Sequence, residues 1–97
     1  MPTLICRNII YYSPLDEQAF FEWVKRIPCI SKITGTGNAL QLEIADTILT
    51  DDELRELLSL FYRYDIDMKQ LAQFATKENA VWFKENHTAY WHKKVFG

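Results

Sequence analysis

The sequence predicts a single α+β domain, in which a small mixed three-stranded sheet carries helices on one face and short helices follow at the C-terminal end. Three observations lead to this fold class. The predicted elements follow the order β-α-β-β-α, apolar residues recur at strand or helix spacing, and 48% of the 97 residues are hydrophobic. A chain of this size and composition forms one domain over residues 1–97, with a core that needs neither disulfides nor metals.

The first predicted element is a strand over residues 3–12, which are rich in Ile and Tyr. Its apolar residues fall on both faces, so we expect a central strand or one covered on both sides. A helix follows, because Ser13 can cap it, Pro14 suits its first position, and Pro28 prevents it from continuing. Its apolar stripe comprises Phe20, Trp23, Val24 and Ile27.

A hairpin is predicted over residues 29–34 and 39–45, because two glycines and an asparagine lie between these segments. Its second strand alternates, with Leu40, Leu42 and Ile44 facing the core. A right-handed crossover through the first helix places the first two strands parallel, which makes the predicted sheet mixed. Whether the third strand lies between the other two is left open at this point.

The segment after residue 49 is predicted to be helical. Thr50 and Glu53 form a capping-box pattern, and the helix that they open should end near Asp65. Its apolar stripe comprises Leu54, Leu57, Leu58 and Phe61. Short helices are expected through Phe74, over residues 77–85, and over a turn or two within residues 89–95. The C-terminal end is rich in aromatic residues, so we expect it to pack on the domain.

The two cysteines, Cys6 and Cys29, lie in apolar segments and do not form a Cys-x-x-Cys motif. This pattern is typical of buried, unlinked thiols in a reducing compartment. The first residues lack the pattern of a signal peptide, and no apolar run approaches the ~18 residues of a membrane span. We therefore expect a cytoplasmic protein with no membrane partner.

The sequence contains no motif that indicates catalysis, and we assign no catalytic residue, metal or cofactor. The segment around Gly35 and Gly37 contains neither the third glycine of a dinucleotide-binding loop nor the Gly-Lys-Ser/Thr of a P-loop. His87 and His92 are five residues apart, a spacing that does not place them on one helical face. The sequence leaves their role open.

Acidic residues concentrate in one part of the chain, although the formal net charge is only −2. Residues 50–67 contain six acidic and two basic side chains, and several of the acids fall in the first turns of the predicted helix. Carboxylates there complement the helix dipole, and they can also attract a basic surface of another protein. The predicted partner-binding residues are Asp51, Asp52, Glu56 and Asp65.

Our first hypothesis is that the chain is a small protein-interaction domain without catalysis, of the inhibitor or immunity type. One alternative is a small enzyme or ligand-binding domain whose site is assembled only in the fold. The other is a nucleic-acid-binding module that uses the basic and aromatic residues 84–94. The isoelectric point of about 5.6 argues against the nucleic-acid alternative.

Overall fold

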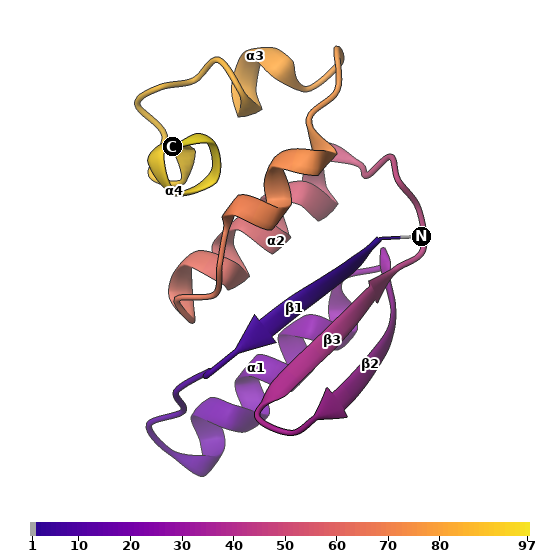
Figure 1. Cartoon of the computed structure of the whole chain (residues 1–97), viewed down its shortest axis with the longest axis vertical. Coiled ribbons are helices and arrows are strands. Elements are labelled where there is room, and N and C mark those ends of the chain that lie inside the picture. Colours follow the sequence, from indigo (N-terminus) through magenta and orange to yellow (C-terminus); the bar gives the residue numbers. More distant parts are fainter. Residues whose placement is uncertain (1) are drawn as a thin grey trace.

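The computed structural model describes residues 2–97 and confirms an α+β fold. Three strands form one sheet, and α1 and α2 cover the same face of it, while the C-terminal helices lie beyond β1 (Figure 1). The elements are β1 (Thr3–Arg7), α1 (Pro14–Arg26), β2 (Ile30–Thr36), β3 (Ala39–Ile44), α2 (Asp51–Arg63), the 3-10 helix η1 (Lys69–Phe74), α3 (Ala80–Phe83) and α4 (His92–Phe96).

The sheet differs from the mixed sheet that the sequence predicted. The strand order is β1-β3-β2, and both neighbouring pairs are antiparallel. β1 and β2 do run in the same direction, as the crossover through α1 requires, but β3 inserts between them. Leu42 and Ile44 of β3 are fully buried. The central position therefore gives the more apolar strand of the hairpin a neighbouring strand on each side. β1 is therefore an edge strand rather than a central one.

β1 is also shorter than the predicted strand over residues 3–12. It ends at Arg7 because Asn8 has a φ of 54°, which takes the backbone out of the extended region. The side-chain amide of Asn38 in the hairpin turn donates a 3.0 Å hydrogen bond to Oδ1 of Asn8 and holds this bend. The apolar residues that follow lie in the connection to α1 rather than in the sheet, with Ile10 and Tyr12 exposed and Ile9 and Tyr11 packed against the core.

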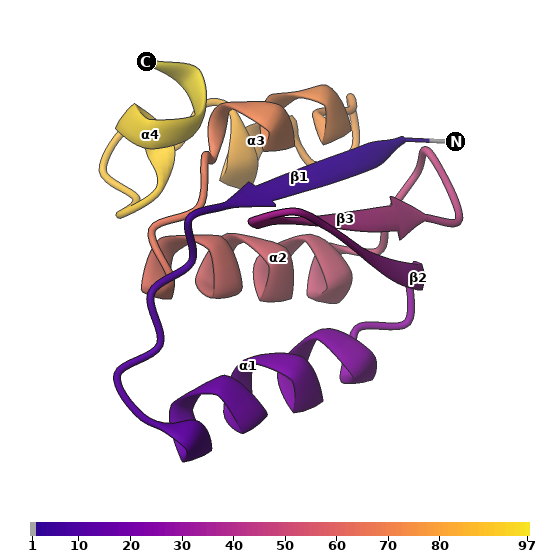
Figure 2. The same ribbon diagram turned by 60° about the horizontal axis from the view of Figure 1, so that its bottom comes forward.

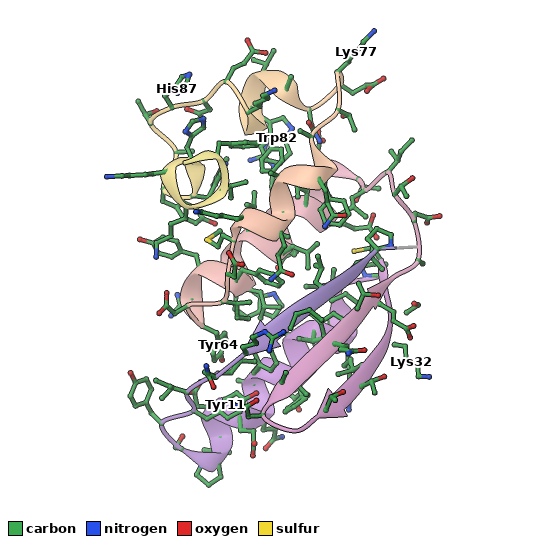
Figure 3. All side chains as sticks on the ribbon, in the orientation of Figure 1. Tyr11, Lys32, Tyr64, Lys77, Trp82 and His87 are labelled. Carbon is green, nitrogen blue, oxygen red and sulfur yellow. The ribbon has the colours of Figure 1, made fainter. Side chains whose placement is uncertain are left out.

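Both edges of the sheet are protected against further strand pairing. At β1, the Gln70 side chain accepts a 2.8 Å hydrogen bond from the Ile5 amide and donates one of 2.8 Å to the Ile5 carbonyl. One side chain thus occupies the backbone groups that a neighbouring strand would use. At β2, the pairing is irregular between Ile30 and Lys32, and the Lys32 side chain extends into solvent (Figure 3). Both features disfavour the addition of another strand.

Replacing Gln70 with Ala is expected to lower the free energy of unfolding by roughly 1–3 kcal/mol, because the backbone groups of Ile5 lose their partners. The freed edge should also make the variant associate at high concentration. Chemical denaturation measures the first effect and light scattering the second. Gln18→Ala is the matched control, because Gln18 is exposed and bonds only to Glu22 within α1. Equal stability of the two variants would contradict an edge-blocking role for Gln70.

The predicted helix caps and the main buried stripe are confirmed. The Ser13 hydroxyl accepts a 3.2 Å hydrogen bond from the Asp16 amide, and Thr50 and Glu53 form the complete capping box. The predicted apolar residues of α2 are all buried in the core, together with Leu60: Leu54, Leu57, Leu58 and Phe61.

The C-terminal segment packs on the domain, as predicted, with Phe83 and Val95 buried and Trp91 only 8% exposed. A short helix through Phe74 and a last helix of a turn or two are present as expected, but the helix predicted over residues 77–85 is shorter. Thr76 and Asn79 exchange two hydrogen bonds between side chain and backbone, of 2.8 and 3.2 Å. These bonds have the reciprocal form of a capping box, as the predicted cap at Thr76 requires, but regular α-helix within residues 77–85 is confined to α3.

Candidate protein-binding surface

α1 and α2 run antiparallel beside one another, as Figure 2 shows. At one end of the pair, the Tyr64 hydroxyl donates a 3.0 Å hydrogen bond to Oδ1 of Asp16. Tyr11 packs there as well, with its ring centroid 6.4 Å from that of Tyr64 (Figure 3). Towards the other end, Nε1 of Trp23 on α1 donates a 2.9 Å hydrogen bond to Glu56 on α2. These contacts fix which residues of the two helices lie opposite each other.

Three adjoining hollows follow the outer side of this helix pair. The first has a volume of about 530 Å³ and is lined by Ala19, Glu22, Trp23, Arg26, Ile27 and Glu56. Trp23 also lines a second hollow of about 500 Å³, together with Ser59, Tyr62, Arg63 and Tyr90. Glu56 also lines a third of about 330 Å³, with Pro28, Thr50, Asp52 and Glu53. We call the surface formed by these three hollows the α1–α2 groove.

The structure brings together three of the four predicted partner-binding residues. Asp51, Asp52 and Glu56 are exposed in the first turns of α2, and the latter two line the groove. Asp65 lies just beyond the C-terminal end of this 13-residue helix, about 20 Å from its start. Its side chain is 93% exposed and lies 3.7 Å from Nζ of Lys94. Asp65 is therefore not part of the acidic surface at the start of α2.

The groove also contains aromatic side chains that sequence reasoning did not assign to a site. Trp23 was placed in the buried stripe of α1, but it is only half-buried and reaches across to Glu56. Tyr62 is 45% exposed, and its ring packs edge-on against Tyr90, with 4.8 Å between centroids. The Tyr90 hydroxyl lies 3.1 Å from that of Ser59 and fixes this pair on α2. In the sequence, this aromatic part of the groove is indicated only by Tyr62, which lies outside the apolar stripe of α2 and was therefore available for an exposed site.

The cysteines are free and buried, as predicted. Burial raises the pKa of Cys6 to about 12. Burial, with a smaller contribution from the Glu53 carboxylate, raises the pKa of Cys29 to about 11. Because the thiolate is the reactive form of cysteine, both groups are poor nucleophiles at neutral pH. The geometry thus favours a structural role for the two thiols.

The two histidines come together, contrary to the expectation from their spacing. Their ring centroids are 4.4 Å apart, because His87 lies in the turn before α4 rather than on the helix that His92 begins. Nε2 of His92 lies 2.8 Å from the Lys84 carbonyl oxygen. Within residues 2–97, His, Cys, Asp and Glu side chains do not gather in groups of three or more that could hold a metal ion.

The aromatic residues of the C-terminal segment mostly pack on each other. The Trp82 and Trp91 rings meet edge to face with centroids 5.9 Å apart, and Phe83 packs on Phe96 at 5.0 Å. The Arg55 guanidinium of α2 lies 4.0 Å from the Trp82 ring centroid and covers it. Tyr90 of the same segment is 48% exposed.

Comparison of the chain with known protein families, with curated proteins and with solved structures gave no match. None of the helices within residues 2–97 is long and apolar enough to cross a lipid bilayer. The functional argument therefore rests on the geometry and charge of the α1–α2 groove.

Proposed function

We propose that this protein is a cytoplasmic protein-interaction domain without catalysis, of inhibitor or immunity type, which binds a basic surface of another protein. One observation carries the proposal. The exposed acids at the start of α2 lie beside an open groove that contains a half-buried tryptophan, and Glu56 belongs to both features. Acidic side chains beside an aromatic anchor are a combination that suits binding of a basic protein surface.

The hydrogen bond from Trp23 supports this role for Glu56. It holds the carboxylate in one place above the groove, so that less side-chain freedom is lost when a partner binds. Glu22 of α1 lines the same hollow and adds a second carboxylate, although Arg26 offsets part of the charge. Asp52 extends the acidic surface towards the end of α2. Carboxylates therefore predominate at this end of the groove.

The geometry favours this function over the two alternatives. A small enzyme would gather polar groups in an enclosed pocket, whereas the hollows of the groove open to solvent and the two thiols are buried. A nucleic-acid-binding module would expose several aromatic faces for base stacking, whereas Trp82 and Trp91 pack against Arg55 and each other and Tyr90 alone of these three is half-exposed. The free thiols of Cys6 and Cys29 support a reducing compartment such as the cytoplasm.

The proposal is tested by removing negative charge without changing shape. The protein is immobilised, the partner is captured from a lysate of the native host and purified, and association is then measured at low and high salt. The double variant Asp52→Asn/Glu56→Gln should associate several-fold more slowly at low salt and nearly normally at high salt, because salt screens these charges. Gln at position 56 retains an oxygen that can accept the Trp23 hydrogen bond.

Asp65→Asn is the matched control, because it removes the same charge at the far end of α2. Asn tolerates the positive φ of 55° at this position, so the control should fold normally. If the double variant associates at the parental rate at low salt, or if the control slows association equally, the acidic start of α2 is not the binding surface.

A further inference from the structure

We infer that the α1–α2 groove is the docking site for an amphipathic helix of the partner protein. The partner helix places Lys or Arg side chains over Asp52 and Glu56 and large apolar side chains over Trp23 and Tyr62. This inference rests on the proposed function and specifies the chemistry of the partner segment. It follows from the shape of the groove, from its charge and from the exposed apolar residues along it.

One stripe of side chains on each helix lines the groove, and Tyr62 with Tyr90 of the C-terminal segment adds to its far end. On α1, Ala19, Trp23 and Arg26 follow helical spacing, and on α2 Asp52, Glu56, Ser59 and Arg63 do so. The contact between Trp23 and Glu56 places the two stripes opposite each other. The groove therefore extends along the whole of α2, whose 13 residues span about 20 Å. This length matches a partner helix of three to four turns.

The two ends of the groove differ in charge. Glu22, Asp52, Glu53 and Glu56 outnumber Arg26 at the end where α2 starts, and Arg63 is the charged lining residue at the end where α2 finishes. A partner segment with basic residues at one end complements this arrangement in one orientation only. The acidic end attracts the segment, and Arg63 disfavours a basic residue at the other end.

The middle and far end of the groove supply apolar contact surface. Tyr62 and Tyr90 are about half-exposed and line one hollow together with Trp23. Tryptophan and tyrosine are the residues that most often dominate binding energy at protein interfaces. Ala19 lines the adjoining hollow on the other side of Trp23 with a single methyl group, so a partner helix can approach closely at that point.

A helix fits this surface better than a strand does. Gln70 occupies the outer edge of β1, and Lys32 with the adjacent irregularity protects the edge of β2, so neither edge readily accepts an added strand. The exposed sides of two antiparallel helices, in contrast, offer ridges and a groove into which a third helix packs. An apolar stripe of residues at i, i+3, i+4 and i+7 on the partner would meet this groove.

The test uses a displayed library of helical peptides of about 14 residues, a length that spans about 20 Å, with an alanine scaffold and one randomised face. Peptides selected on the protein should carry Lys or Arg in one terminal turn and large apolar residues in the middle. In the 1H–15N NMR spectrum, the indole signal of Trp23 should shift when a selected peptide is added. The indole signal of Trp82 should not, because its Nε1 is buried and its ring is covered by Arg55, outside the groove.

Two substitutions show whether the peptides occupy the groove. Ala19→Gln fills its floor with a longer side chain at an exposed helix position that tolerates glutamine, so the fold is retained. Tyr62→Ala removes an anchor. Each should weaken a selected peptide by about tenfold or more. Val81→Gln is the matched control for Ala19→Gln, because Val81 is 76% exposed on α3, and it should leave binding unchanged.

The inference fails if no peptide is enriched, if the enriched peptides lack basic residues, or if they bind Ala19→Gln as tightly as the parent. Measurements with the native partner separate this failure from failure of the proposed function. If Asp52→Asn/Glu56→Gln slows association while Ala19→Gln does not weaken binding, the acidic surface stands and the helix in the groove is excluded. If neither variant changes the binding of the native partner, both the proposed function and the helix in the groove are contradicted.

Discussion

A chain that ends at Phe74 is expected to lose cooperative folding. The missing segment contributes Phe83, Trp91 and Val95 to the core. Removing each of these buried side chains costs roughly 1.5–3 kcal/mol of hydrophobic stabilisation. The sum is comparable with the whole stability of a domain of this size, which is about 5–15 kcal/mol. The deletion also removes Asn79, a buried side chain that donates a 2.9 Å hydrogen bond to the Phe74 carbonyl. Circular dichroism during thermal and urea unfolding measures the effect.

Point substitutions in α3 distinguish lost packing from the general effects of a truncation. Phe83→Ala should lower the free energy of unfolding by about 3–5 kcal/mol, because this ring is fully buried. Val81→Ala, two residues away and largely exposed, should change it by less than about 0.5 kcal/mol. A truncated chain that melted like the full one would show that the C-terminal segment is an appendage, and would revive the hypothesis that it binds nucleic acid.

Local signals in the sequence predicted much of the fold. The capping box at Thr50, the Ser13 cap and the alternation of β3 depend on residues a few positions apart, and the structure contains all three. Two features were missed because they depend on distant parts of the chain. The place of β3 in the sheet depends on how its apolar face meets both helices. The edge contact of Gln70 joins residues that are 65 positions apart.

The length of β1 was misjudged for a different reason. The apolar residues after Arg7 have strand propensity, but the bend at Asn8 is held by the side chain of Asn38, 30 residues away. Propensity describes what a segment prefers alone, and this tertiary hydrogen bond overrides it. The exposed Ile10 and Tyr12 are the consequence.

The candidate site was predicted in part. The helical pattern placed Asp52 and Glu56 on one exposed side of the helix and Asp51 in its first turn, since charge and spacing are visible in the sequence. Asp65 was grouped with them because it is acidic and near in sequence, yet a helix of 13 residues separates it in space. The aromatic part of the groove was not predicted, because Trp23 and Tyr90 come from segments that only the fold brings to α2.

Replacing Leu57 with Ala should lower the free energy of unfolding by about 2–5 kcal/mol. Leu57 lies in the middle of α2 with no exposed surface, inside the cluster that joins α2 to the sheet and α1. Alanine retains the helix but leaves a cavity, and close-packed neighbours relax into it only in part. For a domain of this length, the loss corresponds to a fall in Tm of about 8 °C or more.

Urea unfolding separates this effect from a change in the unfolded state. The midpoint should fall while the slope stays constant, because the surface exposed on unfolding hardly changes. Ile48→Ala is the matched control, since Ile48 also loses methyl groups but is exposed just before α2, and it should cost less than about 0.5 kcal/mol. The same measurement bears on the groove, because the face of α2 that contains Leu57 determines which face carries Asp52 and Glu56. If Leu57→Ala and Ile48→Ala unfold at the same urea concentration, the buried face of α2 is wrongly assigned, and the acidic residues opposite it lose their place on the binding surface.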